Sequence, residues 1–188
     1  MTNSQKLIDM GVKTLIEQTR AKGANPGGGA ILILISNLAI NLMLMMDKKD
    51  WEEYKEIANV SRETILNFSS ELSILMQDDV DNFDKLMKAY KNGKANEGDF
   101  LKASESLLTM IDINLKSLEI LGFYLESGKK SILSDAQVSN ELLRTANLAA
   151  LPIIKVNIGD DGIDYESIEV STNDLYKKNK LIIERRNK

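Results

Sequence analysis

Apolar positions recur at helical spacing along nearly the whole chain. Over residues 4–20 they fall three and four positions apart, which predicts an amphipathic helix. Residues 28–46 are apolar on almost every face, which predicts a helix at the centre of a bundle. Further helices are predicted over about 51–92, 99–127, from 134 past Pro152, and 175–185. No alternating strand pattern, repeat or linker is present, so the sequence predicts one all-α domain spanning residues 1–188, a helical bundle with long antiparallel helices.

Local signals predict where these helices begin and end. Residues 59–61 mark a point where the 51–92 helix could break. Gly128 follows the 99–127 helix in the position of a C-terminal stop. The run Ser134-Asp135-Ala136-Gln137 resembles a capping box at the start of the next helix, and Pro152 is expected to kink that helix.

One carboxylate lies inside the apolar stripe of the 51–92 helix. Asp79 comes three residues after Met76 and four before Phe83, whereas Asp78 and Asp81 fall off the stripe. The stripe consists of Phe68, Leu72, Leu75, Met76, Phe83, Leu86, Met87 and Tyr90. Burial on such a stripe would raise the pKa of Asp79 toward a value useful in acid–base catalysis. The alternative is a carboxylate paired with lysine or one at the edge of an interface.

Consecutive glycines precede the most apolar helix, in Pro26-Gly27-Gly28-Gly29. Each glycine costs about 0.5–1 kcal/mol relative to alanine, so the run indicates a need for bare backbone. Its free N–H groups can face a ligand, or its lack of side chains can permit close packing, and both uses remain open. Pro26 suits a first helical turn, with Asn25 as the cap. No Gly-Lys-Ser/Thr follows, which excludes a phosphate-binding loop.

The amino-acid composition limits which partners and which catalytic groups can be expected. The chain has 188 residues, 43% apolar and 28% charged, and a net charge of −4, which excludes duplex nucleic acid and anionic membrane surfaces as expected partners. It has no cysteine and no histidine, so acid–base chemistry must come from Asp, Glu, Lys, Tyr or water. No metal-ligand spacing is visible, and no metal is expected. Ser36, Asn37 and Asn41 interrupt the apolar run, which favours a buried helix over a membrane span, and the N-terminus resembles no signal peptide; a cytoplasmic protein is expected.

Three short motifs occur in order between residues 26 and 158. The first is Pro26-Gly27-Gly28-Gly29 before the apolar helix, and the second is Asp79 followed by Phe83, Met87 and Tyr90. The third is Ser134-Asp135-Ala136-Gln137-Val138, followed by an alanine-rich helix and Val156-Asn157-Ile158. Together they resemble the cyclodeaminase/cyclohydrolase family. This family comprises the C-terminal domain of formiminotransferase-cyclodeaminase and stand-alone bacterial relatives such as methenyltetrahydrofolate cyclohydrolase-like proteins.

The resemblance implies an all-α homodimer that acts on one-carbon-substituted tetrahydrofolate without a permanently bound cofactor. One family activity closes 5-formimidoyl-tetrahydrofolate to the methenyl form and releases ammonia, and the other hydrolyses 5,10-methenyl-tetrahydrofolate to the 10-formyl form. The resemblance implies a catalytic role for one residue and substrate contacts for seven others. The catalytic residue is Asp79, and the substrate-binding residues are Pro26, Gly27, Gly28, Gly29, Ser134, Asp135 and Asn157.

Departures from the family pattern support an alternative. Ala30 stands where the family has serine, and Ile153 where it has asparagine. Ser134 and Asp135 are also explained by helix capping, and Asn157 by a helix end. The alternative is therefore a catalytically inactive folate-binding or structural helical dimer that keeps the family fold.

Overall fold

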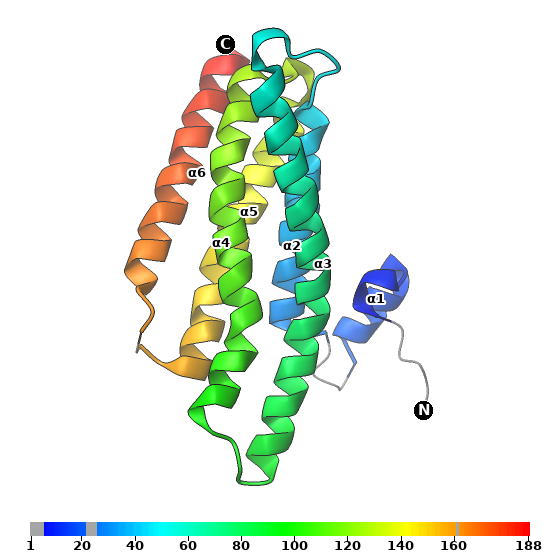
Figure 1. Cartoon of the computed structure of the whole chain (residues 1–188), viewed down its shortest axis with the longest axis vertical. Coiled ribbons are helices and arrows are strands. Elements are labelled where there is room, and N and C mark those ends of the chain that lie inside the picture. The colour runs from blue at the N-terminus through cyan, green and yellow to red at the C-terminus, as the bar shows by residue number, and fades with distance from the viewer. Residues whose placement is uncertain (1–5, 22–25, 161) are drawn as a thin grey trace.

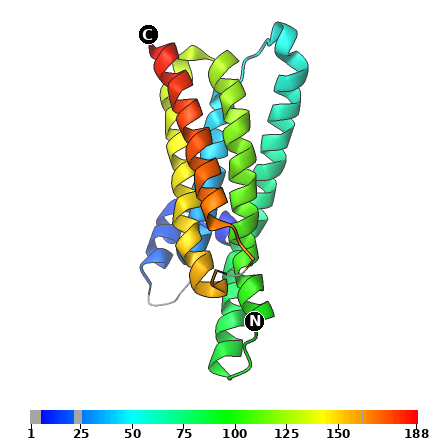
Figure 2. The ribbon, with the colours of Figure 1, turned by 90° about the vertical axis from the view of Figure 1, so that its left-hand side faces the viewer.

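A computed structural model describes residues 6–21, 26–160 and 162–188. Its core is an up-and-down bundle in which each long helix runs antiparallel to the next (Figures 1 and 2). The bundle helices are α2 (Gly28–Met43), α3 (Lys55–Lys91), α4 (Glu97–Ser127), α5 (Leu133–Ile158) and α6 (Tyr165–Asn187). Short 3-10 turns and the small helix α1 (Val12–Thr19) complete the described part of the chain, which contains no strand. The all-α prediction is confirmed.

Helix α2 is central, as its apolar composition predicts. It packs against α3 on one side and α5 on the other, with α4 behind it. Its polar residues find partners: Asn114 Nδ2 donates to Ser36 Oγ at 2.8 Å, and Asn37 Nδ2 donates to Ser69 O and Ser73 Oγ, each at 3.0 Å. By length and composition alone, Gly28–Met46 would pass as a membrane span, but 56% of its apolar window is buried inside the bundle.

The N-terminal segment differs from its prediction. Instead of one helix over residues 4–20, a 3-10 turn (Leu7–Asp9) is separated from α1 at Gly11. Only Leu7 is buried there, and its N–H donates to Gln77 Oε1 at 3.1 Å. Val12 and Ile16 on α1 are 74% and 58% exposed, whereas Leu15 packs against the core, so the apolar face of α1 is only partly covered by the bundle. The predicted cap Asn25 lies outside the described residues.

Helix α3 is continuous, so the break anticipated at residues 59–61 is wrong. Ala58, Ser61 and Ile65 are all buried in the bundle, and this packing holds the segment helical. The α3–α4 hairpin extends past the start of α2 (Figure 1). Tyr90, which the sequence pattern assigns to the buried stripe, lies in this projecting part and is 64% exposed.

The predicted end of α4 is confirmed, since the helix stops at Ser127 and Gly128 follows it, but the predicted starts of α5 and α6 need correction. Gly128 follows α4 with an extended backbone (φ −77°), not a left-handed one. A Cβ there would lie 2.5 Å from Tyr124 O and 2.9 Å from Met46 O, so the glycine permits close backbone approach. Helix α5 begins one residue before Ser134, which caps nothing, and continues through Pro152. Helix α6 begins ten residues earlier than predicted, at Tyr165, because Asp164 caps it by accepting from Ser167 N at 2.9 Å.

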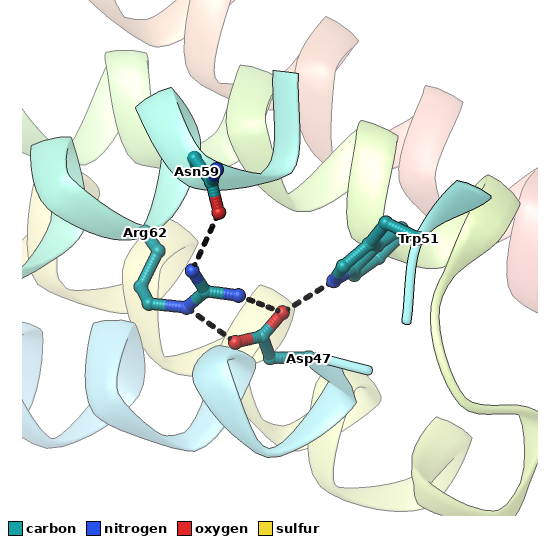
Figure 3. A network of polar contacts seen from close by, with 4 residues as sticks. All are labelled: Asp47, Trp51, Asn59 and Arg62. Atoms are coloured by element: carbon teal, nitrogen blue, oxygen red, sulfur yellow. Dashed lines mark hydrogen bonds and ion pairs between the residues drawn. The ribbon is translucent and has the colours of Figure 1, made fainter. Parts of the chain in front are cut away.

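The connection between α2 and α3 is held by Asp47 (Figure 3). Asp47 accepts hydrogen bonds from Trp51 Nε1 at 2.6 Å and from two nitrogens of Arg62 at 2.5 and 2.9 Å. Burial alone would raise the pKa of Asp47, but the hydrogen bonds from Arg62 and Trp51 outweigh it and lower the pKa. This network fixes the end of the bundle at which α2 stops.

Candidate active site

A pocket of about 350 Å³ lies at the opposite end of α2, where that helix begins. Helices α3, α4 and α5 continue beyond this point and supply the walls. The lining residues are Gly27, Gly28, Gly29, Asp79, Val80, Phe83, Ala103, Ile153 and Asn157. The volume is at the lower end of the range for small-molecule sites, about 300–1,000 Å³, and suits a fused ring with a small substituent.

Asp79 is the carboxylate of this pocket. It lies on the buried stripe of α3 with 9% of its surface exposed, whereas Asp78 and Asp81 are exposed, as the sequence pattern predicts. Burial raises the pKa of Asp79 to about 6, and a hydrogen bond from the backbone N–H of Ala30 limits the rise. The carboxylate therefore lies against the first turn of α2, whose dipole favours negative charge. Such a group can exchange a proton and stabilise a cation near neutral pH.

The glycines serve the carboxylate and the pocket at once. A Cβ on Gly29 would lie 2.5 Å from Asp79 Oδ1 and 2.6 Å from Oδ2, so a side chain there would occupy the place of the carboxylate. A Cβ on Gly28 would meet only Ile153 Cδ1, at 3.5 Å. Of the two uses left open by the sequence, close packing is confirmed at Gly29, and ligand contact by the glycine N–H groups stays a prediction for Gly28, which lines the pocket.

Asn157 reaches the pocket from the last turn of α5. Its Nδ2 donates to Ser104 Oγ at 3.2 Å, and Ser104 Oγ bonds the carbonyl oxygen of Phe100 at 3.2 Å. Ser104 is fully buried on α4, next to the lining residue Ala103. Asn157 also borders a second, more open pocket of about 620 Å³ between the start of α4 and the α5–α6 connection.

The structure brings together only part of the predicted site. Gly27, Gly28, Gly29, Asp79 and Asn157 line one pocket, and Pro26 is buried directly before it. Ser134 and Asp135 lie in the first turn of α5, whereas Asn157 lies in its last. At 1.5 Å per residue this separation is about 35 Å. Within one chain, the third motif therefore spans both ends of the bundle.

Several other charged residues lie away from the lining of this pocket. Asp112, an acid among apolar residues, is exposed on α4. Lys129 and Lys130 are exposed at the far end, and Lys155 forms an exposed ion pair with Asp160 at 2.5 Å. Among the described lining residues Asp79 is the single carboxylate, so the pocket itself offers no set of metal ligands.

Several contributors were missed from the sequence. Ala103 and Ser104 come from α4, which carries no motif, and Val80 adjoins Asp79. Ser104 lies among other buried serines of α4, and nothing in its local sequence distinguishes it.

Comparison with known proteins identifies the family. The sequence model described as formiminotransferase-cyclodeaminase matches residues 11–169, well over half of the chain. The chain belongs to the formiminotransferase-cyclodeaminase family. Its fold is similar to that of formiminotetrahydrofolate cyclodeaminase from Thermotoga maritima, with a TM-score of 0.83 and 21% identity over 94% of this chain and 96% of that chain. No curated protein matches it.

Membership in the formiminotransferase-cyclodeaminase family indicates a cyclodeaminase-like role in folate metabolism. The residue that departs most visibly from the family pattern within the pocket is Ile153, which gives the wall facing Gly28 an apolar surface. The contact made at Ala30 comes from its backbone N–H, which any residue at that position except proline would supply.

Proposed function

We propose that the chain is an enzyme that acts on one-carbon-substituted tetrahydrofolate in the pocket at the start of α2. The reaction is either closure of 5-formimidoyl-tetrahydrofolate with loss of ammonia or hydrolysis of 5,10-methenyl-tetrahydrofolate. The observation that carries the proposal is the buried carboxylate of Asp79, whose pKa is about 6, in a pocket that suits a pterin ring. No permanently bound cofactor is required, because both reactions are additions and eliminations at one carbon.

Both reactions need the same chemical support. In cyclodeamination, N10 forms a bond to the formimidoyl carbon, a proton passes to the exocyclic nitrogen, and ammonia leaves as its bond to carbon breaks. In hydrolysis, water adds to the methenyl carbon, a proton moves to N5, and the bond from carbon to N5 breaks. In each case a carboxylate beside the carbon stabilises the positive charge and relays a proton. Asp79 supplies this group, since at pH 7 it is mostly ionised but remains easily protonated.

We also propose that the working form is a homodimer. Leu38 on α2 is 56% exposed, and Met45 in the 3-10 turn that follows α2 is 46% exposed. On α5, which packs against α2, Val138 is 48% exposed and Val156 is 85% exposed. Val12 and Ile16 on α1 are exposed as well. We take these apolar side chains as the basis for the proposed interface, because exposed apolar surface is typical of subunit contacts.

The test is turnover of both folates by the purified protein. Loss of the near-ultraviolet absorbance of 5,10-methenyl-tetrahydrofolate measures hydrolysis, and ammonia release from 5-formimidoyl-tetrahydrofolate measures deamination. We expect acceleration over buffer in at least one assay and a loss of about 100-fold in Asp79→Asn, the usual scale for an acid–base group. No acceleration in either assay would favour the inactive scaffold, and calorimetry would then establish whether folate still binds.

A further inference from the structure

We infer that Ser104 is a positioning residue that fixes the orientation of the Asn157 amide, and that this orientation favours the formimidoyl substrate over the methenyl substrate. The inference rests on the proposed function. It concerns a residue on α4 that carries no motif, together with the choice between two reactions that share one pocket.

The hydrogen bonds around Ser104 determine which end of the amide faces it. A serine hydroxyl has one hydrogen to donate, and that of Ser104 is directed to the carbonyl oxygen of Phe100 at 3.2 Å. Its oxygen is then free to accept, and it accepts from Asn157 Nδ2 at 3.2 Å. Because Ser104 is fully buried, this partnership is shielded from competing water.

Because Ser104 holds Nδ2, the Oδ1 of Asn157 is the end of the amide left available to a ligand. Among the described residues this oxygen has no hydrogen-bond partner, and Asn157 borders the pocket that also contains Asp79. The two side chains are then both hydrogen-bond acceptors: a carboxylate on α3 and an amide oxygen on α5. Asn157 also lies in the last turn of α5, where the helix dipole favours positive charge.

The two candidate substrates differ in what they offer these acceptors. The protonated formimidoyl group is an amidinium that carries N–H donors on its exocyclic nitrogen. The methenyl bridge is also cationic, but its carbon carries only C–H. A site built to accept hydrogen bonds discriminates against a ligand that lacks the donor, because the acceptor is left unpaired on binding. Ser104 therefore contributes to specificity without touching the substrate.

The test compares Ser104→Ala with Ser106→Ala on both substrates. Ser106 is a matched control, since it is also a buried serine on α4 but, unlike Ser104, is not the hydrogen-bond partner of Asn157. Without the Ser104 hydroxyl the Asn157 amide can rotate and exchange the positions of its oxygen and nitrogen. We therefore expect kcat/KM for the formimidoyl substrate to fall about 10-fold, the effect of one hydrogen bond. Methenyl hydrolysis should change less than about twofold, and Ser106→Ala should leave the ratio of the two activities unaltered.

A double-mutant cycle separates positioning from general structure. If Ser104 acts through the amide, Ser104→Ala should have no further effect on the ratio in an Asn157→Ala background. An equal loss on both substrates, or the same loss with and without Asn157, would overturn the inference while leaving the proposed function intact. Should Ser104→Ala not fold, Asn157→Ala alone must lower the ratio, and an unchanged ratio would overturn the inference. A wild-type protein inactive on both substrates would instead remove the proposed function, and the inference with it.

Discussion

Gly29→Ala tests whether the position and pKa of the Asp79 carboxylate depend on the absence of a side chain in the first turn of α2. The new Cβ would lie 2.5 Å from Asp79 Oδ1, where real Cβ contacts essentially never fall below 3.0 Å, so the carboxylate must move by half an ångström or more. The movement weakens its hydrogen bond from the backbone N–H of Ala30. A hydrogen bond to a charged group contributes about 1.5–3 kcal/mol, which corresponds to a rise of about 1–2 units in the pKa of Asp79.

The expected result is a shift in the pH profile together with a loss of rate. The wild-type pKa is about 6, so the carboxylate is mostly ionised at pH 7, and a higher pKa in the variant reduces that fraction. The rising limb of kcat/KM should therefore move to higher pH. A misplacement of about 1 Å costs up to about 100-fold in rate, so a drop of at least about 10-fold should remain even where the carboxylate is fully ionised.

The assay is kcat/KM between pH 5 and 9, with Gly28→Ala as the control. Its Cβ would meet only Ile153 Cδ1 at 3.5 Å, an ordinary contact, so the carboxylate stays in place and the pH profile should not move. Both substitutions replace glycine by alanine in the first turn of α2, so the effects of the change on backbone entropy are similar and largely cancel in the comparison. If the two variants share the wild-type profile, Asp79 does not depend on bare backbone at Gly29, and the reasoning is refuted.

Four further outcomes follow from the structure. The pKa of Asp79 is raised from 3.8 to about 6, so ionising it costs the fold about 3 kcal/mol once the pH exceeds 6; Asp79→Asn should melt higher than wild type at pH 8, with the gap closing below pH 4. Asp47→Asn leaves Arg62 without its carboxylate and should lower the free energy of unfolding by about 1–3 kcal/mol in urea titrations, with no change in the pH profile of turnover. Because the pKa of Asp47 is lowered, the difference in free energy of unfolding between wild type and Asp47→Asn should be largest at pH 7 and shrink as the pH falls below 4. A difference that stayed the same in acid would contradict this prediction. Gly128→Ala places a Cβ 2.5 Å from a backbone oxygen and should destabilise by roughly 1–3 kcal/mol, in contrast to the usual gain from Gly→Ala. Leu38→Asp should shift the protein toward monomer in light scattering if the α2 face is the dimer interface, and an unchanged mass would point to another face.

Much of the architecture was present in the sequence because local pattern determines it. The period of apolar residues gives the helices, and an almost wholly apolar segment must be the central one, as α2 is. A lone acid on an apolar stripe is buried whatever packs against it, which is why Asp79 was found. These properties depend on neighbours three or four residues away. The start of α6 was missed because its packed face there combines only two partly buried apolar residues, Tyr165 and Ile168, with the buried polar residue Thr172.

The tertiary structure alone decided which residues meet. Gly29 on α2 lies against Asp79 on α3, and Ser104 on α4 lies against Asn157 on α5. Ser134, by contrast, lies at the opposite end of α5 from Asn157. The environment that raises the pKa of Asp79 likewise comes from burial by helices distant in sequence. A one-dimensional pattern specifies which face of a helix is apolar, but not which residue of another helix lies opposite it. That depends on the register in which long helices pack, and register is a property of the whole bundle.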